Sequence, residues 1–267
     1  MKPHYSFETG SATNIGRRYD VNQDYFLLDA NQGIFMIADG VGGGPAGEVA
    51  SRVGINAAFD FLTKNLDMLS QESPGSILNQ TIEKAHRTIQ TICEQVPEYH
   101  GMGTTLSIAW LPGMHDQLWI THVGDCRCYC VRQNDVEQLT RDHTVFNAVK
   151  DANLLSEDPE HWPSRSLLSQ TLGSSDIIAP QNLHRKVRLN DFYFLCSDGI
   201  YEALEKEEIN YHLTQLIHPE LICEGIIQNA LENGATDNLT AVGFKLRPLE
   251  MEQELLAASM AKTVIGG

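Results

Sequence analysis

The sequence lacks any apolar run close to the roughly 20 residues that a helix needs to cross a bilayer. Its first residues, MKPHYSFETG, also lack the apolar centre of a secretory signal. We therefore expect a cytoplasmic protein that does not associate with membranes. No internal repeat and no low-complexity linker interrupts the 267 residues, so a single domain is expected.

Basic residues are scarce. Lys and Arg number 19 against 35 Asp and Glu, which gives a formal net charge of −16. Nucleic-acid phosphates bind basic surfaces, so this balance argues against nucleic-acid binding and against a two-metal nuclease. The glycine-rich stretch GVGGGPAG is not followed by Lys-Ser or Lys-Thr, which argues against a kinase or nucleotide-binding loop.

Zinc-type cysteine spacing is also absent. The chain has six cysteines but no CxxC pair. Three of them alternate in CRCYC, so on a strand their side chains would point to one face. We expect buried, reduced thiols.

Short apolar segments separated by turns predict the strands. Segments 25–29 and 34–39 are expected to form an antiparallel hairpin, and a second hairpin is expected at Gly124-Asp125. Further strands are expected from residues 104, 118, 126, 192 and 238, and helices at 45–66, 73–97, 207–216 and 219–232. Strands in meanders with helices inserted in pairs predict an α+β fold of antiparallel sheets covered by helices.

Acidic residues recur at the ends of these strands. Asp39 and Asp198 follow apolar strands, Asp237 precedes one, and Asp125 lies at the predicted hairpin turn. Carboxylates that converge repel one another unless a cation holds them. Oxygen ligands without His or Cys favour Mg²⁺ or Mn²⁺ over zinc. Two such ions can orient and activate a water for attack on phosphorus, so the pattern predicts phosphoester hydrolysis.

Eight ordered segments strengthen this prediction. They are NQD, ADGVGGGPAGEVAS, GMGTTL, HVGDCRCY, LTRDH, LSQTLG, CSDGIYEAL and TDNLTAV. Together they resemble the metal-dependent protein phosphatases of the 2C type, in their compact bacterial form, over about residues 10–247. The resemblance implies a four-layer α/β/β/α sandwich of two stacked antiparallel sheets flanked by helix pairs. It implies a catalytic domain over residues 1–247, followed by a tail over 248–267 that is helical or loosely held.

The resemblance also assigns site residues. It implies two Mn²⁺ or Mg²⁺ ions bridged by Asp39, with the Gly40 carbonyl on one ion and Asp198 and Asp237 on the other. It implies a third, weaker ion at Asp125. Asp24 is expected to act nearby, either through water or by supporting the metal ligands from behind, and Asn238 to orient Asp237. Arg18 is expected to bind the substrate phosphate, with Arg17 as the alternative.

Three positions depart from the family pattern. Gln23 replaces a Glu before the first motif Asp, as in many bacterial relatives. Tyr19 holds the place of the phosphate-binding Arg, so Arg18 is the expected substitute. Gly44 stands where many relatives have a His that is thought to protonate the leaving group; losing a general acid costs about 10²–10⁴-fold. His143 belongs to the DH motif and is expected to be structural.

Two functions are therefore expected from the resemblance. The first is hydrolysis of phosphoserine and phosphothreonine in proteins by in-line attack of a metal-bridging water or hydroxide, opposing a Ser/Thr kinase. Its partners would be phosphorylated proteins, namely that kinase or its substrates, and the enzyme would act as a monomer. The alternative is a catalytically weak member that serves as a phosphoprotein-binding regulatory module. Residues 144–166 resemble the flap that borders the site in relatives and are expected to influence substrate selection.

Overall fold

The strands of the protein form two antiparallel sheets. The structure, a computed structural model, describes residues 5–41, 46–113, 115–154, 166–173 and 177–248. One sheet has the strand order β1-β10-β9-β6-β7 and the other β2-β3-β4-β5-β8. The strands are β1 (Tyr5–Asn14), β2 (Asp24–Asp29), β3 (Ile34–Asp39), β4 (Leu106–Trp110), β5 (Gln117–Val123), β6 (Arg127–Arg132), β7 (Asp135–Gln138), β8 (Gln181–Lys186), β9 (Phe192–Cys196) and β10 (Leu239–Pro248).

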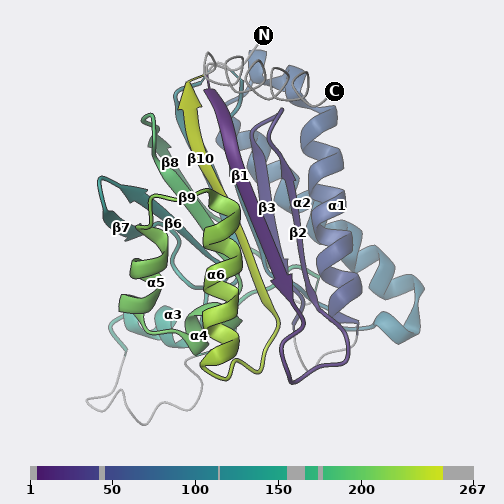
Figure 1. Ribbon diagram of the computed structural model, residues 1–267. Coiled ribbons are helices and arrows are strands. Elements are labelled where there is room, and N and C mark those ends of the chain that lie inside the picture. Colours follow the sequence, from purple (N-terminus) through teal and green to yellow (C-terminus); the bar gives the residue numbers. More distant parts are fainter. Residues whose placement is uncertain (1–4, 42–45, 114, 155–165, 174–176, 249–267) are drawn as a thin grey trace, which may run out of the picture.

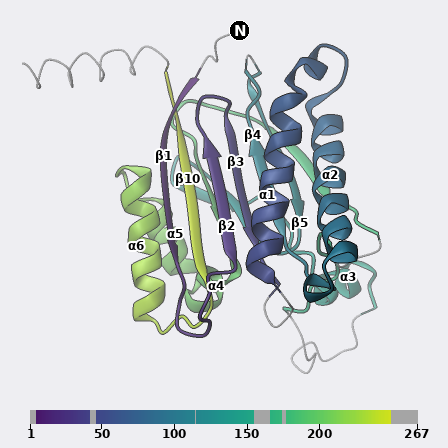
Figure 2. The same cartoon turned by 90° about the vertical axis from the view of Figure 1, so that its right-hand side faces the viewer.

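Helices cover the outer face of each sheet, which gives four layers (Figures 1 and 2). The helices are α1 (Gly47–Lys64), α2 (Pro74–Gln95), α3 (Val145–Asp151), α4 (Asp198–Ala203), α5 (Lys206–Leu213) and α6 (Pro219–Glu232), with 3-10 turns η1 (Leu66–Ser70) and η2 (Pro97–Tyr99). α1 and α2 pack on the β2–β8 sheet, and α4 to α6 pack on the β1–β7 sheet. The predicted α/β/β/α sandwich is confirmed.

The two sheets face each other across a third apolar cluster. Phe35 of β3 stacks on Phe244 of β10 with ring centroids 3.7 Å apart, so the strands of both sheets share this layer. Cys126, Cys128 and Cys130 of the CRCYC run are buried there as free thiols, which confirms their common face. Burial of a phenylalanine side chain such as Phe35 or Phe244 contributes roughly 1.5–3 kcal/mol to the free energy of unfolding, and it holds the two sheets face to face.

Local sequence explains the limits of the longest helix. Ser73 caps α2, because its Oγ accepts a hydrogen bond from the Ser76 N–H at 3.2 Å, and Pro74 occupies the first turn. The helix ends just before Pro97, whose ring disfavours helical backbone in the preceding residue. On the face of α2 that packs on the sheet, Ile77, Ile82 and Ile89 are fully buried.

The prediction of a hairpin at Gly124-Asp125 was wrong. β5 pairs with β4 and β8, whereas β6 pairs with β7 and β9, so this turn carries the chain from one sheet to the other. Gly124 has a φ of +105°, and a Cβ there would lie 2.4 Å from the Thr105 side chain. A tight glycine turn therefore serves a crossover here, and it places Asp125 at the end of the sandwich.

Four elements were not predicted: β1, β7, β8 and α4. β1 is mostly half-buried, β7 is mostly exposed and β8 exposes alternate residues, and none of the three sequences contains an apolar run. Within the flap, α3 is helical, whereas residues 155–165 and the tail 249–267 lie outside the described residues. Within the described chain, no helix is both long and apolar enough to cross a membrane.

Candidate metal centre and active site

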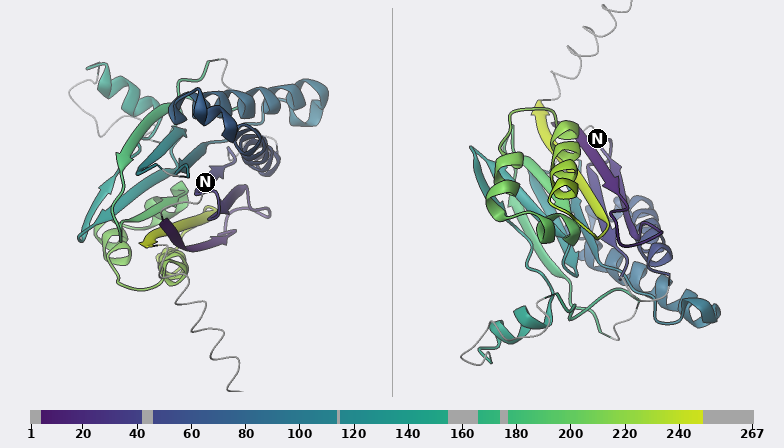
Figure 3. Two further views of the ribbon diagram at one scale, coloured as in Figure 1. Left: turned by 90° about the horizontal axis from the view of Figure 1, so that it is seen from above. Right: turned by 60° about the horizontal axis from the view of Figure 1, so that its bottom comes forward.

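Acidic side chains from separate segments meet at one end of the sandwich. α3 projects from this end (Figure 3). Asp39 ends β3, Asp198 begins α4 directly after β9, and Asp237 lies just before β10. These positions converge because β9 and β10 are antiparallel neighbours and β3 faces them from the other sheet. With Asp125 and Arg18 they line one cleft of about 610 Å³, so the predicted convergence is present.

Hydrogen bonds at both its N–H and its carbonyl hold the main chain of Asp39 against Thr104 and Thr105. Its N–H donates to the Thr105 Oγ1 at 2.8 Å, and its carbonyl accepts from the Thr105 N–H and the Thr104 Oγ1, both at 2.8 Å. Gly40 follows and admits no side chain, because a Cβ would lie 2.2 Å from the Gly47 carbonyl oxygen. The glycine therefore lets the start of α1 approach the end of β3.

Burial and mutual repulsion perturb the carboxyl groups. Burial, followed by the charge of Asp198, raises the pKa of Asp39 well above its ordinary value. Burial and Asp198 raise the pKa of Asp125 to about 8. Burial likewise raises the pKa of Asp24 and of Asp198 to about 6. Without a cation, the cleft therefore retains protons near neutral pH.

Glu202 belongs to this cluster, although sequence reasoning missed it. Ligand oxygens of Asp198, Glu202 and Asp237 lie within 4.8 Å of one another. Glu202 is four residues after Asp198 on α4, which places both on one face of the helix. The i, i+4 spacing of two acids after an apolar strand was the available signal, but α4 itself was not predicted.

This donor set fits divalent cations. The cleft offers carboxylate oxygens, and the buried Asp198 Oδ1 and Gln23 Oε1 have no hydrogen-bond partner within the described part of the chain. Buried polar atoms without partners cost free energy, which a bound ion or its waters would recover. Hard oxygen donors suit Mg²⁺ or Mn²⁺.

The two candidate phosphate ligands differ in position. Arg18 lines the cleft, with its Nη1 3.8 Å from the Asp237 Oδ2 and most of its side chain exposed. Arg17 instead donates from Nη2 to the Leu231 carbonyl at 3.1 Å, near the end of α6, and does not line the cleft. Arg18 is therefore the guanidinium that a ligand in the cleft can reach.

Asp24 and Asn238 support the cleft from behind. Asp24 pairs with Asp39 across β2 and β3 and accepts a hydrogen bond from the Ser197 Oγ at 2.7 Å. The Asn238 side chain accepts from the Gln23 N–H and donates to the Ile15 carbonyl, each at 2.7 Å. Only the backbone N–H of Asn238 contacts the Asp237 carboxylate, at 2.8 Å. The amide side chain thus anchors the loop that carries Arg18.

The far wall of the cleft comes from residues 166–171, which follow the undescribed part of the flap. No histidine is among the described residues that line the cleft, and Gly44 lies outside them. The His143 ring is held behind the wall, where its Nδ1 lies 3.2 Å from the Gly124 N–H and 2.7 Å from the Gln170 Nε2. These contacts are what a structural role for His143 requires.

Comparison with known proteins identifies similar chains. Residues 15–233 match the family model described as protein phosphatase 2C. The chain is 32% identical over 240 residues to the serine/threonine protein phosphatase PstP of Mycobacterium tuberculosis, covering 84% of this chain and 44% of that protein, so it spans less than half of this relative. It is 29% identical to the serine/threonine phosphatase Stp of Listeria monocytogenes, covering 86% of this chain and 92% of Stp.

Solved structures agree with these matches. The catalytic domain of PstP in complex with two manganese ions has a TM-score of 0.74 and 28% identity, and the match covers 91% of this chain and 99% of that one. Another PstP crystal structure, from Mycobacterium tuberculosis, has a TM-score of 0.76 and 29% identity. The shared fold therefore extends over nearly all of the residues that form the sandwich.

Proposed function

Because the chain belongs to the protein phosphatase 2C family, we propose that it hydrolyses phosphoserine and phosphothreonine in proteins with the help of divalent cations. One observation carries the proposal: Asp39, Asp198 and Asp237, from three segments, line a single cleft beside Arg18. Carboxylates this close repel one another unless cations bind between them. A guanidinium beside them can form paired hydrogen bonds with a phosphate.

Specific residues would hold two Mn²⁺ or Mg²⁺ ions. Asp39 and the Gly40 carbonyl would serve one side of the cleft, and Asp198 and Asp237 the other. Glu202, whose carboxylate lies close to those of Asp198 and Asp237, would join their side of the cleft. Asp125, which lines the same cleft, would add a third, weaker site. When bound, such ions polarise a phosphoryl oxygen and activate water for in-line attack.

The remaining residues orient the substrate and the ligands. Arg18 would bind the phosphate, since its guanidinium is the exposed cation that lines the cleft. Asp24 would keep the end of β2 against β3 and so hold Asp39 in place. We assign no phosphate contact to Arg17, whose side chain is engaged at α6.

The test is phosphate release from phosphoserine and phosphothreonine peptides and from p-nitrophenyl phosphate with Mn²⁺. We expect activity that Asp39→Asn abolishes, because the substitution removes a negative charge from the centre of the cleft. Asp60→Asn is the matched control, as Asp60 is an exposed carboxylate of α1 paired with Lys64. Activity that persists in excess EDTA would reject the proposal.

The same assay tests the alternative function. The described cleft residues include no histidine, which favours a catalytically weak, phosphoprotein-binding module. Phosphopeptide binding to the metal-loaded protein without hydrolysis would support that module, whereas robust turnover would eliminate it.

We further propose that the enzyme is a monomer, with residues 1–247 as its catalytic domain, and that it opposes a Ser/Thr kinase in the cytoplasm. The names of the relatives support the class of substrate. Phosphoproteomics on a deletion strain and its parent would identify the substrates. Phosphosites that rise only in the deletion strain, and fall when active enzyme but not the Asp39→Asn variant is restored, are expected.

A further inference from the structure

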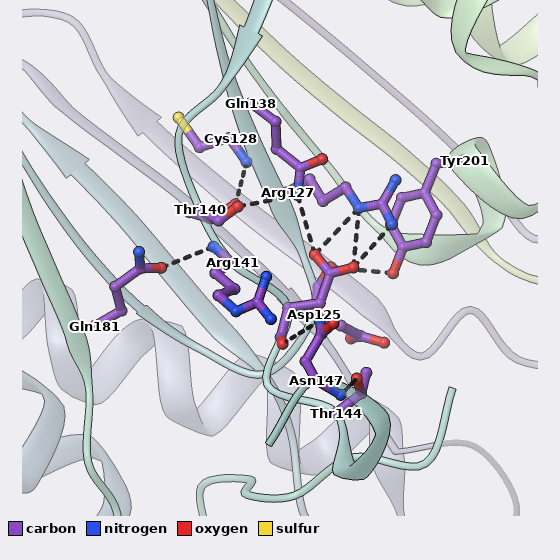
Figure 4. Close-up of polar contacts among 11 residues, drawn as sticks. Asp125, Arg127, Cys128, Gln138, Thr140, Arg141, Thr144, Asn147, Gln181 and Tyr201 are labelled. Carbon is purple, nitrogen blue, oxygen red and sulfur yellow. Dashed lines mark hydrogen bonds and ion pairs between the residues drawn. The ribbon is translucent and has the colours of Figure 1, made fainter. Parts of the chain in front are cut away.

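A cluster of aromatic and charged residues lies directly behind Asp125. Arg127, at the start of β6, donates to both carboxylate oxygens of Asp142, from Nε at 3.1 and 3.2 Å and from Nη2 at 2.8 Å. The same guanidinium lies over the Tyr201 ring, 3.4 Å from its centre (Figure 4). The hydrogen bonds to Asp142 restrain the guanidinium within its plane, and the contact with the Tyr201 ring restrains it perpendicular to that plane. We call these three side chains, which hold one another in place, the Arg127 brace.

The Arg127 brace touches both walls of the acidic cleft. The Tyr201 hydroxyl donates to the Asp125 carbonyl at 3.1 Å. Tyr201 itself lies on α4, three residues after Asp198 and directly before Glu202. The brace therefore connects the turn that carries Asp125 to the helix that carries Asp198 and Glu202.

The brace also contacts the start of the flap. The Asp142 carbonyl accepts from the Asn147 Nδ2 of α3 at 2.9 Å, and the Gln138 Nε2 donates to the Asp142 Oδ1 at 3.2 Å. Thr144 caps α3, with its Oγ1 accepting from the Asn147 N–H at 3.2 Å. The Asp142 carboxylate thus joins β6 to the end of β7, and its backbone carbonyl holds α3.

Carboxylates that repel one another stay close together only where the surrounding structure holds them, as the Arg127 brace does between the Asp125 turn and α4. Repulsion between Asp125 and Asp198 favours a wider cleft, and a cation can bind strongly only where its ligands are already close. Positioning groups of this kind change metal affinity about 10- to 100-fold. We infer that the Arg127 brace sets the position of Asp125 relative to α4, and thereby the affinity of this side of the cleft for a divalent cation.

The same strand provides a matched control. Arg132, at the other end of β6, forms an equivalent fork with Asp191, with Nε–Oδ1 at 2.9 Å and Nη2–Oδ2 at 2.7 Å. Both forks are largely buried, with arginine side chains 24% and 20% exposed. Arg132 lines a different cavity, away from the acidic cleft. Arg127→Met and Arg132→Met therefore remove the same kind of ion pair at two ends of one strand.

The experiment measures Mn²⁺ binding to the full, metal-free chain by calorimetry and by electron paramagnetic resonance of the free ion. We expect Arg127→Met to weaken the weakest Mn²⁺ site about tenfold or more, and Arg132→Met to leave it unchanged although the melting temperature of both variants falls. Tyr201→Phe, which keeps the stack and loses the hydroxyl, is expected to fold normally and to show a smaller weakening. Tyr201→Leu is expected to resemble Arg127→Met.

The choice of Mn²⁺ as the cation rests on the proposed function, but the results of this experiment distinguish a failure of the brace's role from a failure of that function. Equal Mn²⁺ affinities in the wild type and the Arg127→Met and Tyr201→Leu variants would overturn the role of the brace and leave the phosphatase proposal intact. Equal losses in Arg127→Met and Arg132→Met would also overturn it, since they would reflect general destabilisation. A wild type that binds no Mn²⁺ would remove both proposals.

Discussion

Loading the metal-free protein with Mn²⁺ at pH 6.5 is expected to release protons. The pKa of Asp125 is raised to about 8 and that of Asp198 to about 6, while burial raises the pKa of Asp39 well above its ordinary value. A cation binds only the ionised carboxylate, so each bound proton must leave when the ion enters. Proton release therefore measures how far burial and mutual repulsion raise the pKa values of these acids before the ion binds.

The number of protons released on Mn²⁺ binding follows from these pKa values. At pH 6.5 a group with a pKa of about 8 is roughly 97% protonated, and one with a pKa of about 6 roughly 25%. Asp125 and Asp198 together then release about 1.2 protons, and Asp39 adds up to one more. At pH 9 Asp125 is about 90% ionised, so its contribution falls to about 0.1.

The assay is titration calorimetry in pairs of buffers that differ in ionisation enthalpy, because the slope of heat against that enthalpy equals the number of protons exchanged. Asp125→Asn is expected to lower the slope at pH 6.5 by about one proton and to change it little at pH 9. Heats that are independent of the buffer at pH 6.5, with Mn²⁺ bound, would refute the reasoning.

Three further outcomes are expected. The raised pKa of Asp125 gives stability that is complete below the unfolded value near 4 and is lost as the pH rises from there through about 8. Asp125→Asn is therefore expected to raise the melting temperature of the metal-free protein, relative to the wild type, much more at pH 9 than at pH 5; a gain of equal size at both values would contradict this. Arg18→Ala is expected to lower kcat/KM for phosphopeptides roughly 10- to 100-fold, with Arg17→Ala near the wild type in steady-state assays, and equal losses would remove the distinction. Gly124→Ala is expected to cost on the order of 2–4 kcal/mol in urea unfolding, because its φ is +105° and the new Cβ would meet Thr105; an unchanged midpoint would be inconsistent with the turn described.

The predicted and the missed elements of the fold differ in burial. β3 and β9 are buried almost throughout, and their apolar runs were sufficient to predict them. β8 alternates half-buried and exposed residues in the sequence QNLHRK, and β7 is largely exposed, so neither differs from a loop in composition. Such strands form because neighbouring strands offer unpaired backbone groups, which is a tertiary effect.

The candidate site was predictable where one residue and its local turn determine position. Asp39 and Asp198 follow buried strands, and their placement at one end of the sandwich follows from strand direction. The position of Asp125 required knowing that the chain changes sheets at Gly124, which a short glycine turn does not reveal. Glu202 required recognition of α4, a helix of six residues that is too short to show a period.

The formal charge of the cleft accounts for its need for cations. Five carboxylates line it, and Arg18 is its one described cation. Fully ionised, these groups leave four negative charges, which two divalent cations would neutralise. A phosphomonoester dianion that enters the loaded cleft adds two negative charges, so a third cation at Asp125 would bind more tightly with substrate present than without it. Mn²⁺ titrations with and without a slowly hydrolysed phosphopeptide analogue would measure this coupling, and affinities equal in the two conditions would argue against it.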